Sequence, residues 1–385
     1  MRMFYVYFHD ADSVPIHVEE VVREMQRQGC MVDLFAHHNA RKVIGSSPYC
    51  RKHLGWTPRI RFLSELIFMV QLLPLLLYQA FVHRPDAIYV RHSGISIVAA
   101  FVARMLGLPC LIEVNDIQTD RLKFVDPPKL KLAWVDFYNR ISFRQATRML
   151  PNTHQIGNWI AETYHISKNR ITVIPNGVNT SRFIPRLRSE ARKKYGLDEE
   201  KKIIVCLGSL FPWAGIETLI EALPAILARN PELFVMIGSN EEPYLSQIKE
   251  LVEKRGFQAQ VGFYGFIPWN EASWFISCAD LCASPYVFKD KRSGLSSLRV
   301  LSYLSCGRPV VGSDIPGLGD MLEANKVGVS FKMGNSTDMA AKVVDLFAKP
   351  AELKSMGERA RDFVENDCTW ESVVKRIFRS SLSEE

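Results

Sequence analysis

Charged and polar side chains follow several apolar segments that have the composition of buried strands. Arg91 and His92 follow DAIYV, and Asn115 and Asp116 follow LIEV. Cations and amides bind phosphate and hydroxyl oxygens, whereas carboxylates can accept or orient a proton. We therefore predict that Arg91, His92 and Asn115 bind a ligand, and that Asn115 and Asp116 are catalytic candidates. His17, in the first turn of a predicted helix, is a further binding candidate, with helix capping as the alternative.

A second group of cations lies in the other half of the chain. The segment FKDKRSG contains Lys289, Lys291 and Arg292, and Arg299 follows it at the start of a predicted helix. Lys and Arg side chains neutralise phosphate groups in proteins. We predict that Lys291, Arg292 and Arg299 bind an anionic ligand, and Arg292 is a third catalytic candidate. A solvated helix surface is the alternative for Arg299.

Strand-like and helix-like segments alternate through both halves of the sequence. The strand-like segments are MFYVYF, CMVDLFAH, DAIYVR and PCLIEVND in the first half, and KKIIVCLGSL, ELFVMIGS, VGFYGFI and DLCASPY in the second. This alternation is typical of parallel βαβ units, whose ligands bind at the carboxyl ends of the strands. We predict an α/β protein with two Rossmann-like, doubly wound domains facing a central cleft.

The charge is distributed unevenly over the 385 residues. The first 170 contain 21 Lys and Arg against 14 Asp and Glu, whereas the remainder contains 27 of each, so the net charge of +7 belongs to the first part. A basic half favours an anionic neighbour, such as membrane phosphates, a phosphate-bearing substrate or nucleic acid; a solvated basic face is the alternative. The sequence lacks the interleaved basic and aromatic residues of nucleic-acid binding strands, so we expect no nucleic-acid partner.

The cysteines and the first residues indicate a cellular compartment. The eight cysteines are scattered without a metal-ligand pattern, so we expect reduced thiols and no metal site. The opening MRMFYVYFHDADS is too short in its apolar run for a signal peptide and is expected to form the first strand. These features predict a cytoplasmic protein.

A long apolar run at residues 62–82 has nearly the length of a membrane span. Glu65, Gln71, Pro74 and Gln79 interrupt it, which a spanning helix rarely tolerates. We predict a helix that packs on the sheet and exposes an apolar edge beside basic residues, as suits a protein peripheral to the inner face of the plasma membrane. An ordinary buried helix is the alternative. The basic residues before the run are Arg51, Lys52, Arg59 and Arg61.

Several segments, in the same order and spacing, resemble the family-4 retaining glycosyltransferases of the GT-B fold. They are ITVIPNGVNTSRF, CLGSLFPWAGIETLIEALPAI, VGFYGFIP, CASPY and LRVLSYLSCGRPVVGSDIPGLGDML, with WESVVKRI near the end. The resemblance covers nearly the whole chain. It implies an acceptor-side domain at residues 1–170, a linker at 171–195, a nucleotide-sugar domain at 196–367, and a helix at 368–385 that returns to the first domain.

The resemblance implies transfer of a sugar from a UDP-, GDP- or ADP-sugar to a saccharide or lipid-linked acceptor in glycan assembly, without a metal cofactor. The acceptor would contact His17, Arg91, His92 and Asn115. The donor would contact Gly208, Ser209, Gly265, Phe266, Ser284, Lys291, Arg292, Gly294, Arg299 and Ser302.

The sequence departs from the family pattern at four donor-binding positions. The Arg and Lys of the loop after the first strand of the second domain correspond to Ser209 and Ala214, and the two glutamates correspond to Gly294 and Ser302. Loss of the two cations alone would cost several kcal/mol of transition-state stabilisation, because each charge-assisted hydrogen bond contributes about 1.5–3 kcal/mol. Two hypotheses follow: a transferase with a rearranged donor site, or a catalytically inactive scaffold that binds or activates a partner glycosyltransferase.

Overall fold

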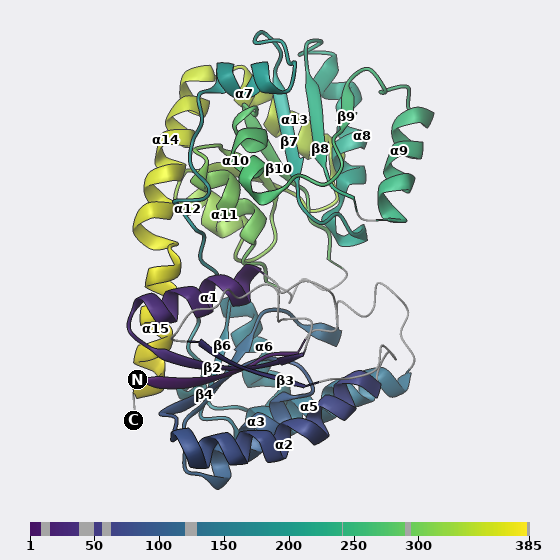
Figure 1. Cartoon of the computed structure of the whole chain (residues 1–385). Helices are drawn as coiled ribbons and strands as arrows, with labels where there is room; N and C mark the ends of the chain where they lie inside the picture. Colours follow the sequence, from purple (N-terminus) through teal and green to yellow (C-terminus); the bar gives the residue numbers. More distant parts are fainter. Residues whose placement is uncertain are drawn as a thin grey trace. The chain divides into compact units, whose positions relative to one another are not determined.

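The computed structural model describes residues 1–8, 16–37, 50–55, 63–119, 129–240, 242–288 and 294–382. The chain forms two compact units, one with residues 1–176 and 370–385 (unit 1) and the other with residues 177–369 (unit 2). Each unit contains one six-stranded sheet in which every described strand pair is parallel (Figure 1).

Unit 1 has the strand order β3-β2-β1-β4-β5-β6. Its central strands are largely apolar on both faces because helices cover both sides of the sheet, as parallel sheets require, whereas the edge strand β3 has the polar sequence CRKHLG. Helices α2 and α3 pack against Phe4, Val6, Ile88 and Val90 on one face, and α1 and α15 pack together on the other. The strands are β1 (Arg2–Val6), β2 (Met31–His37), β3 (Cys50–Gly55), β4 (Ala87–Arg91), β5 (Cys110–Val114) and β6 (Arg148–Pro151). The helices are α1 (Ile16–Arg27), α2 (Leu63–His83), α3 (Ser96–Met105), α5 (Lys129–Gln145), α6 (His154–Tyr164), α15 (Trp370–Leu382) and the short η3 (Lys168–Arg170).

Unit 2 repeats this architecture with the order β12-β11-β10-β7-β8-β9. One face of its sheet packs on α8, α9 and α13, and the other packs on α10, α11 and α14. The strands are β7 (Ile203–Leu207), β8 (Phe234–Gly238), β9 (Val261–Phe263), β10 (Leu281–Ser284), β11 (Val310–Ser313) and β12 (Gly328–Phe331). The helices are α7 (Arg188–Lys194), α8 (Ile216–Leu227), α9 (Tyr244–Lys254), α10 (Trp269–Ser277), α11 (Leu298–Ser305), α12 (Gly319–Ala324), α13 (Ser336–Phe347), α14 (Pro350–Asp367) and the short η4 (Pro212–Ala214).

Counted within each unit, both sheets have the order 3-2-1-4-5-6, which is that of doubly wound nucleotide-binding folds. The predicted α/β class with two Rossmann-like domains is therefore confirmed. In such sheets the crevice for a ligand lies where the strand order reverses, between β1 and β4 in unit 1 and between β7 and β10 in unit 2.

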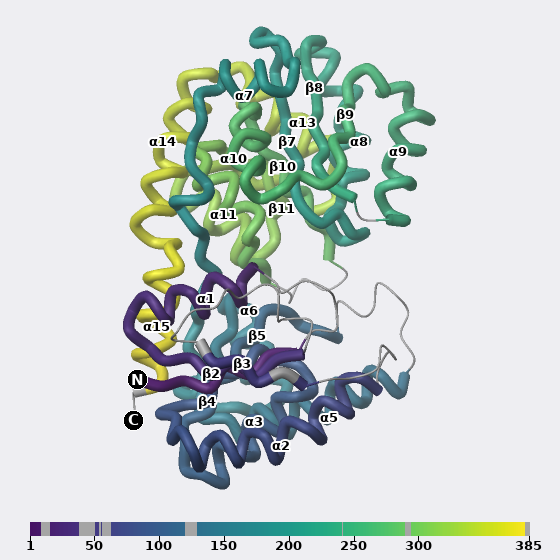
Figure 2. The backbone as a smooth tube through the Cα atoms, viewed as in Figure 1, coloured from purple at the N-terminus to yellow at the C-terminus, as the bar shows by residue number. Residues whose placement is uncertain are grey.

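Two helices of unit 1 have notable surfaces or positions in the chain. The apolar run at residues 62–82 forms α2, which packs on the sheet as predicted and exposes an apolar edge. The last helix, α15, belongs to unit 1, although the whole of unit 2 lies between it and the rest of that unit in sequence. Figure 2 shows the end of the chain, in yellow, lying beside the purple α1.

Candidate functional site

The carboxyl end of the unit 1 sheet is organised around one buried carboxylate, Glu113, on β5. Tyr89 of β4 and Asn115 each donate a hydrogen bond to it. Nε2 of His17 lies 3.2 Å from its Oε1, and Nη1 of Arg91 lies 3.6 Å from the same atom. Parallel pairing of β4 with β5 brings these side chains together, because Arg91 is the register partner of Glu113. Three predicted binding residues therefore share one partner.

Burial and charge fix the protonation states of this group. The pKa of Glu113 lies below its usual value: burial raises it, but attraction to His17 and Arg91 and the two hydrogen bonds lower it by more. The pKa of His17 falls to about 4, mainly because burial disfavours the charged ring. At neutral pH the group therefore contains an ionised carboxylate, a guanidinium and a neutral imidazole.

Asn115 and Asp116 follow β5 directly, as predicted. The backbone carbonyl of Asn115 accepts a hydrogen bond of 3.1 Å from Nδ2 of Asn152, which follows the neighbouring β6. Asn115 thus links two strand ends to Glu113. An amide cannot act as a general acid or base, so Asn115 orients groups here and does not transfer protons.

His92 faces the interior of unit 1. Its Nε2 lies 2.6 Å from Oδ1 of Asn139, and its Nδ1 lies 3.3 Å from Oγ of Ser96. Burial lowers its pKa to about 4. Both ring nitrogens therefore already have partners within the domain, and an acceptor contact for His92 stays a prediction.

In unit 2, side chains on one face of α11 form hydrogen bonds with the backbone at the end of β7. The hydroxyl of Tyr303 accepts from the backbone N–H of Leu207 at 2.7 Å and donates to its carbonyl at 3.0 Å. One helical turn earlier, Nη2 of Arg299 donates to the carbonyl of Ser209. Since residues four apart share a face of a helix, α11 binds the strand end at two successive points.

This contact places a cation in the loop after β7. The guanidinium of Arg299 stacks 5.1 Å from the ring centroid of Tyr286, which follows β10. A Cβ at Gly208 would lie 3.1 Å from Nε of Arg299, so the glycine permits the close approach. Nη1 of Arg299 has no hydrogen-bond partner among the described residues. Burial lowers the pKa of Arg299, but Tyr286 and Tyr303 raise it by more, so the side chain is charged.

The same loop packs closely against the end of β10. Gly215 has φ +65°, and a Cβ there would lie 2.0 Å from the carbonyl oxygen of Pro285. Ser284, the last residue of β10, is fully buried, and its hydroxyl has no partner among the described residues. The two strand ends at the reversal point thus form one compact structure around Arg299.

The other predicted donor residues differ in what they offer a ligand. The hydroxyl of Ser302 donates to the carbonyl of Leu298 at 2.9 Å, so its proton is used within the helix. Gly265 has φ +67° with open space beside it, and Phe266 is 61% exposed. Gly294 is buried. Lys291 and Arg292 lie outside the described residues, as do the neighbouring Lys289, Arg59 and Arg61.

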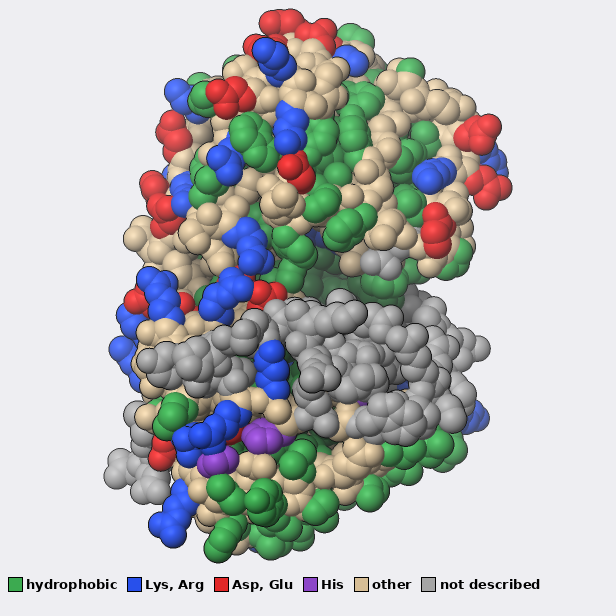
Figure 3. Space-filling model, viewed as in Figure 1, with side chains coloured by type: hydrophobic (Ala, Val, Ile, Leu, Met, Phe, Trp, Pro, Cys, Tyr) green, Lys and Arg blue, Asp and Glu red, His purple; other side chains and the backbone are tan. Residues whose placement is uncertain are grey.

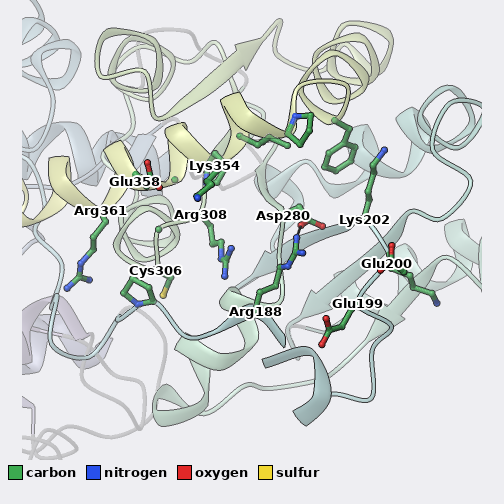
Figure 4. A pocket seen from close by; sticks show the side chains of 18 of the residues that line it. Arg188, Glu199, Glu200, Lys202, Asp280, Cys306, Arg308, Lys354, Glu358 and Arg361 are labelled. Atoms are coloured by element: carbon green, nitrogen blue, oxygen red, sulfur yellow. Dashed lines mark hydrogen bonds and ion pairs between the residues drawn. The ribbon is translucent and has the colours of Figure 1, made fainter. Parts of the chain in front are cut away.

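A hollow of about 1010 Å³ lies at the opposite, amino end of the unit 2 sheet (Figure 4). Its central carboxylate, Asp280, contacts Arg188 and Arg192 at 2.7 Å each, and Arg308 donates to the carbonyl of Ser277. These ion pairs and hydrogen bonds connect the elements of unit 2 away from the strand ends where a ligand is expected. The lining residues include Arg188, Glu199, Glu200, Lys202, Asp280, Cys306, Arg308, Lys354, Glu358 and Arg361. Among the described residues, no group of three or more His, Cys, Asp or Glu side chains is arranged to hold a metal ion.

Sequence reasoning missed Glu113 and Tyr89 as members of the unit 1 group. Both lie inside apolar strand segments, where a single polar residue gives no sign of its partner. The pairing of β4 with β5 brings them together across 24 positions of sequence. A carboxylate within a strand that is otherwise wholly apolar was the available signal, because such a group is buried only when it is paired.

Comparison with known proteins agrees with this architecture. A family model described as Glycosyltransferase Family 4 matches residues 14–182, and one described as Glycosyl transferases group 1 matches residues 188–363. The sucrose-phosphate synthase of Thermosynechococcus elongatus is 17% identical with a TM-score of 0.78, covering 98% of each chain. HepE of Anabaena, solved in complex with UDP, is 16% identical with a TM-score of 0.78, covering 99% of each chain. These structures show the GT-B fold.

Two relatives in sequence are sugar transferases. A GDP-mannose-dependent alpha-(1-6)-phosphatidylinositol monomannoside mannosyltransferase of Mycobacterium tuberculosis is 30% identical over 210 residues, which are 53% of this chain and 54% of the relative. A D-inositol 3-phosphate glycosyltransferase of Rhodococcus jostii is 24% identical over 242 residues, which are 61% of this chain and 52% of the relative. The matched region is thus about half the length of each relative. With its fold and with family models that match both halves, the chain belongs to the family-4 glycosyltransferases.

Proposed function

We propose that this protein transfers a sugar from a nucleotide-sugar donor to a hydroxyl group of a saccharide or lipid-linked acceptor, at the cytoplasmic face of a membrane. Unit 2 binds the donor at the ends of β7 and β10, and unit 1 binds the acceptor at the ends of β4 and β5. One relative named above is GDP-mannose-dependent and is named for phosphatidylinositol monomannoside, and the other is named for D-inositol 3-phosphate, which supports this class of donor and acceptor.

The position of Arg299 carries the proposal. The family's cations in the loop after β7 are replaced here by Ser209 and Ala214. Arg299 reaches that loop from α11 and binds the carbonyl of Ser209. Its Nη1 is buried and has no hydrogen-bond partner among the described residues, so a phosphate oxygen at this point would pair a donor that is otherwise unsatisfied. In this proposal Arg299, supplied by α11, stabilises the charge that develops on the donor diphosphate during transfer.

The acceptor side is proposed from the group around Glu113. Glu113 orients Arg91 and Asn115, and Arg91 keeps its charge because the pKa of its guanidinium is raised overall despite burial. A guanidinium of this kind suits a phosphate on a lipid-linked acceptor. Asp116 stays the catalytic candidate of this edge, because it alone among the predicted residues after β5 carries an ionisable group.

The rival hypothesis is an inactive scaffold that binds a partner transferase. One observation favours it: the hydroxyl of Ser302, at the position of a family glutamate, donates its proton to its own helix. A scaffold would need no donor contact at this point.

Calorimetric titration distinguishes the two hypotheses. The wild-type protein, Arg299→Met and Arg299→Lys are titrated with UDP, GDP, ADP and their sugar conjugates. Arg255→Met, which changes an exposed arginine paired with Glu221 on the α8–α9 side of unit 2, is the matched control. We expect micromolar binding of one nucleotide, weakened about 10–100-fold in Arg299→Met, because one charge-assisted hydrogen bond contributes about 1.5–3 kcal/mol.

The nucleotide affinity of Arg299→Lys should lie between those of wild type and Arg299→Met, and the affinity of Arg255→Met should equal that of wild type. Absence of wild-type binding at millimolar ligand would favour the scaffold. Equal affinity of wild type and Arg299→Met would remove Arg299 from the donor site. Activity is then tested by nucleotide release upon addition of phosphatidylinositol or saccharide acceptors.

A further inference from the structure

The outward face of α2 is apolar along nearly its whole length. Its inward stripe is spaced by four residues, and Phe68, Leu72, Leu76 and Ala80 are buried in the core of unit 1. An ordinary surface helix is polar on the opposite side. On α2 that side carries Leu66, Val70, Pro74, Tyr78, Phe81 and Val82, a set we call the α2 face. Val70, Tyr78 and Phe81 are 69%, 64% and 85% exposed.

Neighbouring helices extend the α2 face. Helix α3 packs against α2, and α5 packs against α3. On these neighbours Phe101, Met105, Leu130 and Phe137 are also exposed. Figure 3 shows hydrophobic side chains gathered along the rim where Figure 1 labels α2. Soluble proteins rarely expose a continuous apolar surface of this kind unless a partner covers it.

The helices that carry this surface also carry exposed basic side chains. The three helices and the residue after α2 carry six Lys and Arg side chains, but only two carboxylates, Glu65 and Asp136. Glu65 accepts a hydrogen bond from the backbone of Gly94, and Asp136 pairs with Arg140, so neither offsets the remaining cations fully. The basic residues are Arg84, Arg104, Lys129, Lys131, Arg140 and Arg144.

By length and composition α2 could cross a bilayer, with a mean hydropathy of 1.8 and only 22% of that window buried. A crossing would remove Phe68, Leu72 and Leu76 from the core, where each is at most 1% exposed. The helix can therefore keep its inward stripe on the sheet only if it lies flat.

We propose that the α2 face rests on an anionic lipid bilayer, with α2 parallel to the membrane plane. Val70, Tyr78 and Phe81 enter the boundary between headgroups and acyl chains, and the surrounding Lys and Arg side chains contact lipid phosphates. Apolar insertion and basic attraction together are the two signals that peripheral anchoring needs. The inference specifies the membrane contact of the proposed function, but it rests only on the geometry of unit 1.

The test is cosedimentation with vesicles of phosphatidylcholine alone and of phosphatidylcholine mixed with phosphatidylglycerol. Val70→Asp/Phe81→Asp changes two exposed residues of the α2 face, and Lys129→Glu/Lys131→Glu changes the basic surround. Leu187→Asp is the matched control, since this leucine of unit 2 is 67% exposed. Nucleotide affinity and circular dichroism of each variant report folding and the donor site independently of lipid binding.

We expect wild-type binding to mixed vesicles at least tenfold above binding to phosphatidylcholine, weakened by salt. Val70→Asp/Phe81→Asp should lower binding to mixed vesicles at least tenfold. Lys129→Glu/Lys131→Glu should lower only the phosphatidylglycerol-dependent part of the binding, and Leu187→Asp should not change it. Unaltered binding of Val70→Asp/Phe81→Asp, or absence of wild-type binding, would overturn the proposal. A wild-type dimer in lipid-free solution that becomes monomeric in Val70→Asp/Phe81→Asp would instead assign the face to a second copy of the chain. Loss of lipid binding with intact nucleotide binding leaves the proposed sugar transfer untouched.

Discussion

Protonation of one buried histidine is expected to destabilise unit 1 in mild acid. His17 is 5% exposed, its ring meets Trp370 edge-on at 5.0 Å, and its Nε2 faces Glu113. Burial is the main cause that lowers its pKa from 6.5 to about 4; Arg91 lowers it further, whereas Glu113 and Asn176 raise it. In the unfolded chain the same imidazole has its ordinary pKa, so acid favours unfolding.

The size of the effect follows from the two pKa values. A depressed histidine pKa means that full stability is present above pH 6.5 and is lost as the pH falls towards 4. Each pH unit in that window removes about 1.4 kcal/mol, so His17 alone lowers the free energy of unfolding by about 2 kcal/mol at pH 5. The pKa of Glu113 lies below 4.5, so its contribution is lost only at lower pH. The pKa of His92 is also lowered to about 4 by burial, so its protonation likewise lowers the free energy of unfolding as the pH falls.

The assay compares how steeply the opening free energy of unit 1 changes with pH in each variant. The contribution of His92 is the same in all of them and therefore cancels in the comparison. Hydrogen exchange of the β4 and β5 amides, corrected for intrinsic rates, gives the opening free energy of unit 1 between pH 7 and 4.5. Wild type, His17→Gln and His154→Gln are measured, the last because His154 is exposed. We expect the slope of His17→Gln to be smaller than that of wild type by about 1.4 kcal/mol per pH unit, and the slope of His154→Gln to be unchanged. Equal slopes for wild type and His17→Gln would mean that the ring accepts a proton without opening, and the reasoning would fail.

Three further substitutions in unit 2 have defined consequences. Gly215→Ala should cost about 2–4 kcal/mol in urea unfolding, because its Cβ would overlap a backbone carbonyl at a positive φ; a cost below about 1 kcal/mol would show that the loop relaxes freely. Asp280→Asn should cost about 3–5 kcal/mol because the fully buried guanidinium of Arg192 loses its ionic partner; thermal unfolding close to wild type would contradict this. Tyr303→Phe should cost about 1–3 kcal/mol and weaken nucleotide binding, because the N–H of Leu207 loses its partner and α11 loses an attachment beside Arg299; unchanged calorimetric affinity would separate α11 from the donor site.

The sequence contained enough to predict the fold. Alternating strand and helix segments indicated parallel sheets, because strands buried on both faces are apolar throughout, as in IIVCL of β7. The interruptions by Glu65 and Pro74 also indicated that residues 62–82 pack on the sheet and do not span a membrane. These are local patterns, and they depend only on periodicity and on the residues that end each element.

The site was predictable only in part. Residues that follow a strand, such as Arg91 and Asn115, could be placed at the correct edge. The meeting of Arg299 with the Ser209 carbonyl could not, because 90 positions separate the partners and only the docking of α11 brings them together. Ser302 was identified as a departure from the family pattern, but the local hydrogen bond from its hydroxyl to the carbonyl of Leu298 was not foreseen, because a helical serine can bond either its own backbone or a ligand.

The return of α15 to unit 1 has a consequence for synthesis on the ribosome. Residues 1–176 emerge first, yet the side chains that cover α1, among them Trp370, Val374 and Ile377, are translated last. At about 5–20 residues per second, the intervening unit 2 delays their arrival by about 10–40 s. During that interval the first unit exists with an uncovered apolar helix, a state that chaperones recognise. A premature stop codon before Trp370 would make this transient state permanent, so even a short C-terminal truncation should direct the chain towards aggregation or degradation.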